Sequence, residues 1–337
     1  MDWGLAKGGI ALSVLDLVPI TEGSTPAEAF RRSAELAQHA ERLGYRRFWV
    51  AEHHSMPGIA SSATAVVIAY LAQHTRTIRV GSGGVMLPNH APLVVAEQFG
   101  TLASMFPGRI DLGLGRAPGT DAPTIRALGG DPDRHGHDFP ERLADLLRYF
   151  HPPEDEVRRV RAVPGEGMDI PIWLLGSSDF SARLAAELGL PFAYASHFAP
   201  DYLMIALETY RANFRPSKWL KEPYAMVGAA VVAAPTDEEA RYLASSSQLQ
   251  QLSLIRGKPS RLQPPVERVQ DLCSPYEWQV LQTRGRLAIV GGQDTVRDRL
   301  RAFIDATKAD EVIIVSQIYD HAARLRSYEI VADVMRA

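Results

Sequence analysis

Short apolar runs alternate with amphipathic stretches along almost the whole chain. Runs rich in β-branched, aromatic and small apolar residues predict eight buried strands, at residues 10–17, 48–54, 78–87, 110–114, 172–175, 192–195, 225–232 and 311–315. The stretches between them carry helix signals. Thr25, Pro26 and Glu28 form a helix start, for example, and Phe30 and Ala34 begin the apolar stripe that follows. Alternation of strand and helix predicts parallel strands joined by crossover helices.

Eight such units in 337 residues predict a closed (β/α)8 barrel, the TIM-barrel fold, as a single domain over residues 1–337. Residues 118–171 predict an insertion between the fourth and fifth strands, helical over 140–150. The polar, proline-rich residues 257–275 predict a long surface loop after the seventh strand. Asp294 is expected to cap a helix that runs to about residue 308. The alternative, an open doubly wound sheet, lacks support because no dinucleotide fingerprint or Walker A lysine is present.

Charge and composition exclude several classes of partner. The formal net charge is −3, so no electrostatic footprint suggests nucleic acid or an anionic membrane surface. No apolar run approaches the roughly 20 residues of a membrane-spanning helix. The one cysteine, Cys273, forbids an intrachain disulfide, and a cytoplasmic location is therefore expected.

The second predicted strand ends in Glu52, His53 and His54, which brings ionisable groups to the rim where barrels bind ligands. An imidazole there can act as an acid or base near neutral pH. On spacing alone, a structural role in helix capping or in pairing with arginines is about as well supported as an acid or base role. A metal site is disfavoured because no HExxH motif is present. His90 and His197 are further candidates at the same rim, although each alone is more often structural.

Two more patterns mark the rim. Glycines at 81, 83 and 84 interrupt the third strand, which indicates a bulge, a barrel corner or a ligand lying against the backbone. Arg116 follows the fourth strand, while Ser177, Ser178 and Ser181 lie where a helix begins after the fifth. Arginine and a helix N-terminus both bind phosphate, so together they predict one phosphate-bearing ligand.

With these residues placed, the chain resembles the bacterial-luciferase-like flavin monooxygenases over nearly its whole length. The resemblance is carried by residues 48–54, 80–88, 107–116, 174–191 and 318–328. It implies a barrel that binds FMN, supplied as FMNH2, at its C-terminal rim. Arg116, Ser177, Ser178 and Ser181 match positions that hold the flavin phosphate. Gly83 and Gly84 match a pair joined by a cis peptide bond that faces the flavin ring, and Ala195 and Ser196 match positions beside the flavin.

The same resemblance implies a function and partners. Glu52 matches a carboxylate that contacts the flavin and His53 matches the catalytic histidine, so both are expected to act in catalysis. The implied reaction is oxygenation of a small organic substrate by O2 through a C4a-peroxyflavin, with FMNH2 supplied by a separate NAD(P)H:flavin reductase. Family members are commonly dimers, so a homodimer is expected. Gly115 stands where luciferase itself has a reactive cysteine, so light emission is not expected. The alternatives are a flavin-binding protein without catalysis and an oxidoreductase that uses deazaflavin F420.

Overall fold

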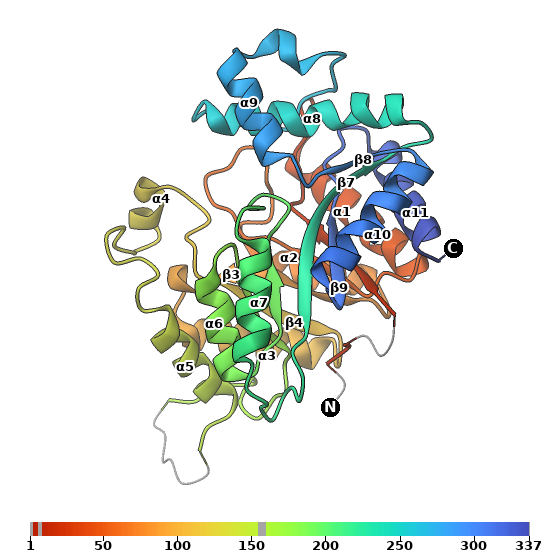
Figure 1. Ribbon diagram of the computed structural model, residues 1–337. Helices are drawn as coiled ribbons and strands as arrows, with labels where there is room; N and C mark the ends of the chain where they lie inside the picture. The colour runs from red at the N-terminus through yellow and green to blue at the C-terminus, as the bar shows by residue number, and fades with distance from the viewer. Residues whose placement is uncertain (1–2, 6–8, 154–159, 337) are drawn as a thin grey trace.

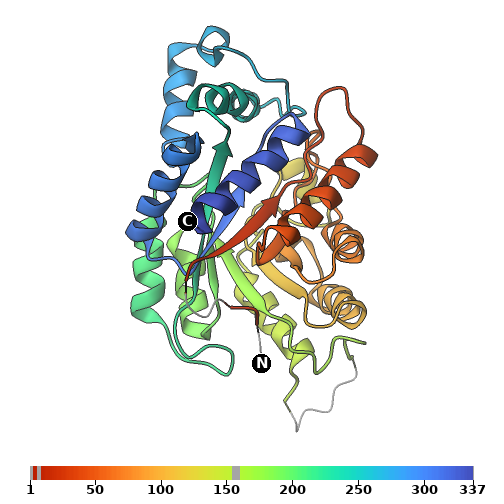
Figure 2. The ribbon, with the colours of Figure 1, turned by 90° about the vertical axis from the view of Figure 1, so that its right-hand side faces the viewer.

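The computed structural model describes residues 3–5, 9–153 and 160–336 and shows a closed barrel of parallel strands (Figure 1 and Figure 2). Each strand pairs with the next, and pairing of β7 with β9 and of β9 with β1 closes the ring. The predicted (β/α)8 fold is therefore confirmed. The barrel strands are β1 (Ala11–Asp16), β2 (Arg47–Val50), β3 (Arg79–Met86), β4 (Ile110–Gly115), β5 (Ile172–Gly176), β6 (Phe192–Tyr194), β7 (Ala225–Ala233) and β9 (Glu311–Val315).

Helices surround the barrel and bury its outward-facing residues. On β2, Phe48 and Val50 face this helical layer, whereas Trp49 belongs to a separate cluster inside the barrel. The surrounding helices are α1 (Pro26–Arg42), α2 (Thr64–His74), α3 (Pro92–Met105), α5 (Phe139–Phe150), α6 (Asp179–Leu188), α7 (Leu203–Asn213), α10 (Gln293–Thr307) and α11 (His321–Arg336).

The predicted loop after β7, residues 257–275, is irregular through residue 268, and the segment that contains it holds more secondary structure beyond the loop than the sequence predicted. Besides α8 (Asp237–Ile255), this segment forms a 3₁₀ helix (Val269–Leu272), α9 (Pro275–Arg284) and a short strand β8 (Ile289–Gly291) that pairs with the end of β7. Helices α8 and α9 lie beyond the end toward which β7 runs, in both views (Figure 1 and Figure 2). The irregular part of this loop is hydrogen-bonded, through Leu262, to Ile20 and Glu22 of the β1–α1 connection.

Two smaller differences concern helix starts. Gly292, not Asp294, is the cap of α10, and Asp294 stands within its first turn. The insertion between β4 and β5 holds a short helix α4 (Ala122–Ala127) before α5, which the sequence did not predict. Residues 154–159 of that insertion lie outside the described part of the chain. A further 3₁₀ turn (Leu87–Asn89) follows β3.

A charged and aromatic layer fills the N-terminal part of the barrel. The Arg47 side chain is fully buried, and its guanidinium contacts Asp111 Oδ2 at 2.7 Å and Glu311 Oε1 at 2.8 Å. The same guanidinium lies 4.7 Å from the ring centre of Trp173, which packs edge-on against Trp49. Each charge has a partner of opposite sign, and these large side chains are buried at the first residues of their strands, so the layer closes the N-terminal end of the barrel. Any site inside the barrel must therefore open at the C-terminal end.

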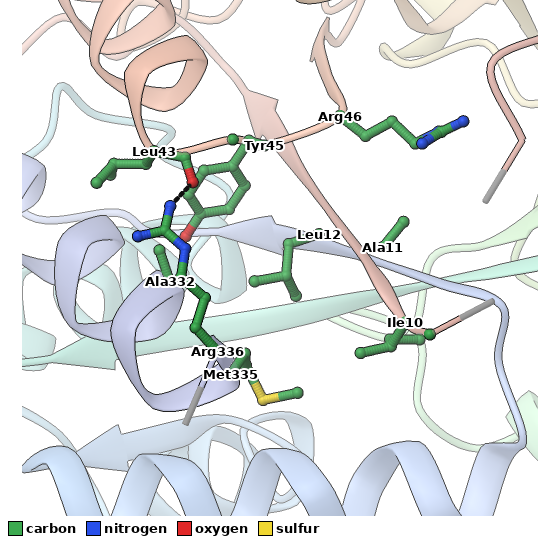
Figure 3. Close-up of a pocket in the computed structure, with 11 residues that line it drawn as sticks. Ile10, Ala11, Leu12, Leu43, Tyr45, Arg46, Ala332, Met335 and Arg336 are labelled. Atoms are coloured by element: carbon green, nitrogen blue, oxygen red, sulfur yellow. Dashed lines mark hydrogen bonds between the residues drawn. The ribbon is translucent and has the colours of Figure 1, made fainter. Parts of the chain in front are cut away.

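A cavity of about 310 Å³ lies outside the barrel, at its N-terminal end (Figure 3). It is bounded by the start of β1, the turn between α1 and β2, and the end of α11, where Arg336 donates a hydrogen bond to the carbonyl of Leu43. Turns that lead into barrel strands lie opposite the face where barrel enzymes carry their sites, so this cavity is not the candidate site. Within the described ranges, helices long and apolar enough to span a membrane are absent.

Candidate functional site

The barrel opens at the C-terminal ends of its strands into a mouth lined by apolar residues and glycine. The side chains that point into the barrel form rows along the strands. Toward the C-terminal end these rows reach residues that remain partly exposed, at Leu17, Gly83, Leu175, Ala195 and Ala230. Gly83 is joined to Gly84 by the expected cis peptide bond. A Cβ at Gly83 would lie 2.7 Å from Leu15 Cδ1, so bare backbone forms part of the floor. Such a surface admits a flat ring in close contact with the backbone.

Glu52 is the centre of a hydrogen-bond network beside this floor. Its side chain is buried, and its carboxylate accepts hydrogen bonds from His54 Nε2 at 2.8 Å, His90 Nε2 at 2.9 Å and Asn89 Nδ2 at 3.0 Å. The backbone N–H of Met86 donates a further bond at 3.0 Å. The carboxylate therefore ties the end of β2 to the end of β3 and the 3₁₀ turn that follows it.

The same contacts set the charge of Glu52. Burial alone would raise the pKa of this carboxyl, but hydrogen bonds from His90, His54 and Asn89, together with the attraction of His90, outweigh it and lower the pKa. An ionised carboxylate with four donors positions its neighbours and is poorly suited to donating a proton. In the part of the chain that the structure describes, no cluster of three or more His, Cys, Asp or Glu side chains is arranged to hold a metal ion.

His53 lies outside this network. Its Nδ1 faces the carbonyl of Gly119 at 3.2 Å, so Nδ1 carries the hydrogen and Nε2 keeps its lone pair. Gly119 belongs to the insertion after β4 and has a φ of +63°, and a Cβ there would lie 2.9 Å from the Glu52 carbonyl. Burial lowers the pKa of His53, against the opposing effects of the Gly119 hydrogen bond and the Glu52 charge. The side chain is thus a neutral base near pH 7.

The predicted phosphate-binding residues come together on the other side of the mouth. The Arg116 guanidinium lies 4.2 Å from the ring centre of Phe180, in the first turn of α6. Ser178 is the N-cap of α6, but its side chain makes no capping bond. Within the described ranges, Arg116 forms no ion pair, and the hydroxyls of Ser177 and Ser178 bond to no other protein group. These donors, with the positive end of a ten-residue helix, form a cradle open to an anion.

Ser181 and the end of β6 support this cradle. The buried Ser181 packs on Gly176, where an added Cβ would lie 2.7 Å from Ser181 Cβ. Ala195 donates its N–H to the carbonyl of Gly176 at 2.9 Å. Ser196 is buried and its hydroxyl donates to the Gly228 carbonyl at 2.6 Å, so this hydroxyl fixes β6 against β7.

The structure thus places three groups of predicted side chains around one mouth: Glu52 with His54 and His90, His53 alone, and Arg116 with Ser177 and Ser178. The predicted Gly83 and Gly84 lie at its floor, and Ala195 and Ser196 follow the end of β6. Sequence patterns did not indicate that Asn89 contacts Glu52 or that Gly119 contacts His53. Only the fold brings these residues together. Gly228 also went unnoticed, although a glycine inside the apolar seventh strand is a signal of close approach.

Comparisons with known proteins show which family this chain is similar to. A family model described as luciferase-like monooxygenase matches residues 11–310. A protein of Escherichia coli strain K12 named luciferase-like monooxygenase is 52% identical over 329 residues, covering 96% of this chain and 97% of that protein. An N-acetyl-S-alkylcysteine monooxygenase of Bacillus subtilis strain 168 is 35% identical, covering 97% and 99%. The crystal structure of apo-MsnO8 superimposes with a TM-score of 0.85, at 37% identity and with 97% and 98% coverage.

Proposed function

Since this chain belongs to the luciferase-like monooxygenase family, we propose that it uses reduced FMN and O2 to oxygenate a small organic substrate. The observation that carries the proposal is the cradle of Arg116, Ser177 and Ser178, whose donors have no acceptor among the described protein groups. It lies beside a mouth whose floor at Gly83 is bare backbone. A phosphate with a flat ring attached fits both features.

The residues present fit FMN in chemical terms. The phosphate would accept hydrogen bonds from Arg116, from the two serine hydroxyls and from the backbone N–H groups that begin α6. The ring would lie against the Gly83–Gly84 backbone, where a larger side chain would clash with Leu15. The bound reduced flavin supplies the electrons for the activation of O2.

The protein side chains supply proton transfer, orientation and exclusion of water. His53 offers the lone pair of Nε2 and accepts a proton, because its Nδ1 is held by Gly119. Glu52 fixes the end of β2 against the end of β3 and the 3₁₀ turn after it, because it accepts hydrogen bonds from Met86 and Asn89. The apolar residues of the mouth, among them Leu17 and Leu175, disfavour water beside a bound ring.

The substrate and the source of electrons belong to the same proposal. The related Bacillus subtilis protein acts, by its name, on N-acetyl-S-alkylcysteines. Thioethers of this class are therefore the first substrates to test, followed by aldehydes and aromatic compounds. A separate NAD(P)H:flavin reductase is the proposed source of FMNH2. The phosphate cradle would also accept deazaflavin F420, and titration with both cofactors distinguishes an F420-dependent oxidoreductase from the proposed enzyme.

Arg116→Ala tests the cradle. We expect the Kd for FMN to rise roughly 10- to 150-fold, because a hydrogen bond to a charged group contributes about 1.5–3 kcal/mol. Flavin fluorescence titration measures this effect. Riboflavin, which lacks the phosphate, should bind the variant and the original protein equally.

A matched control comes from α6 itself. Arg183 pairs with Asp179 on the exposed side of that helix, so Arg183→Ala should leave FMN affinity unchanged. An equal loss of riboflavin and FMN binding in Arg116→Ala would contradict a phosphate-binding role.

A further inference from the structure

His197 occupies a place that the proposed function does not yet use. It follows β6, and its ring lies against the backbone of β7, where a Cβ built on Gly228 would be 2.3 Å from His197 Nδ1. On β7, Met226 belongs to the cluster inside the barrel, while Val227 and Ala229 face the helices. Alternation therefore turns Gly228 inward. The imidazole thus stands where an inward side chain of β7 would be, in the mouth.

The turn that carries His197 is held on both sides. Ser196 Oγ donates to the Gly228 carbonyl at 2.6 Å, and the N–H groups of Phe198 and Ala199 both bond to the Ala195 carbonyl. The Tyr194 hydroxyl bonds to the carbonyl of Ser177 at 3.0 Å, which joins this turn to the phosphate cradle. A side chain fixed in this way contacts a ligand without first being ordered.

His197 and His53 face the mouth from opposite strands. In the ring of strands, β6 is four places from β2, which is half of the barrel. Burial lowers the pKa of His197 to about 4, and repulsion from His53 adds to the decrease. Among the described residues, His53 is the titratable group that acts on His197. Both imidazoles are consequently neutral at pH 7.

The surroundings also decide which nitrogen of His197 carries the hydrogen. Nδ1 is shielded from solvent and has no hydrogen-bond partner in the described protein. A buried N–H without an acceptor is rarer in proteins than an acceptor without a donor. The hydrogen is therefore assigned to Nε2, on the far side of the ring from Gly228.

We propose that His197 is a positioning residue whose Nε2–H donates a hydrogen bond to a carbonyl oxygen of the flavin ring. This inference rests on the proposed function, because it requires a flavin in the mouth. The flavin ring carries two carbonyl oxygens that can only accept hydrogen bonds, which a neutral donor satisfies without adding charge. His53 would then serve as the base on one side of the mouth, and His197 as the fixed donor on the other.

Three substitutions at position 197 test the donor, with oxidised FMN as the probe. His197→Leu removes the N–H and should raise the Kd for FMN roughly three- to tenfold. His197→Gln places an amide N–H near the position of Nε2 and should restore affinity to within about twofold. His197→Asn reaches only the position of Nδ1 and should bind as weakly as the leucine variant. Equal affinity in all three, or rescue by asparagine instead of glutamine, overturns the proposal.

Gly228→Ala provides a second test that keeps the imidazole. The new methyl group would displace the ring from its seat, so FMN binding should weaken as in His197→Leu, with the thermal midpoint measured alongside. A folded Gly228→Ala protein with unchanged affinity counts against the assignment. If the unsubstituted protein does not bind FMN, the proposed function fails instead.

Nitrogen-15 NMR of histidine-labelled protein reads the protonation state without any ligand. The signal lost in His197→Gln should show the Nε2–H tautomer and remain neutral down to about pH 5, against a pKa of about 6.5 for an ordinary histidine. Protonation near pH 6.5, or hydrogen on Nδ1, would contradict the proposed role.

Discussion

His53→Ala is expected to lower the rate of product formation by roughly 10²- to 10⁴-fold, the usual contribution of a positioned acid or base. The reason is geometric. The Gly119 carbonyl holds the hydrogen on Nδ1, so Nε2 is the lone pair available in the mouth, and alanine supplies none. Product is measured by mass spectrometry after mixing the protein with chemically reduced FMN, O2 and a thioether, aldehyde or aromatic substrate that the unsubstituted protein accepts.

Two controls separate proton transfer from structural damage. FMN affinity should stay within about threefold in His53→Ala, and His74→Ala, on the exposed side of α2, should retain full activity. The rate of the unsubstituted protein should fall on the acidic side, below pH 6.5, because burial lowers the pKa of His53 and only the neutral form accepts a proton. An unchanged yield in His53→Ala would remove this residue from the mechanism.

Arg47→Met should destabilise the protein by about 3–5 kcal/mol, the cost of removing one partner from a buried ion network. Arg47 is fully buried and lies between Asp111 and Glu311, so methionine leaves two carboxylates with fewer counter-charges inside the barrel. Arg79 still reaches Asp111 at 2.6 Å, but Glu311 loses its arginine. Urea unfolding followed by fluorescence measures the change.

The matched control is an exposed arginine. Arg241 pairs with Glu238 on the surface of α8, and Arg241→Met should leave the urea midpoint unchanged. A midpoint for Arg47→Met that equals that of the unsubstituted protein would show that the charged layer does not hold the barrel together.

The barrel could be predicted from sequence because each strand carries its own signal. Apolar β-branched runs and helix starts such as Thr25–Pro26 depend on residues a few positions apart. Helix α9 also had such a signal, the capping box of Ser274 and Glu277, but the surrounding polar, proline-rich sequence obscured it. Gly292, the cap of α10, has no side chain that could mark it as a cap in the sequence. Asp294 has a typical capping side chain, which explains the incorrect prediction.

The site was predictable only in part, for a different reason. Glu52, His53 and Arg116 were indicated because each follows a strand and therefore reaches the rim. Their contacts depend on loops distant in sequence, as when Gly119 meets His53 or Asn89 meets Glu52. A sequence pattern likewise could not show that four donors already saturate the Glu52 carboxylate.

The most direct test of the central claim is the fate of labelled oxygen. Protein loaded with chemically reduced FMN is mixed with ¹⁸O2 and a thioether of the N-acetyl-S-alkylcysteine class, followed by aldehydes and aromatic compounds. The proposed function predicts that one ¹⁸O atom enters the organic product and that NAD(P)H is not required. Quantitative formation of hydrogen peroxide, with no label in any organic product, would contradict it and leave a protein that binds flavin without oxygenating a substrate.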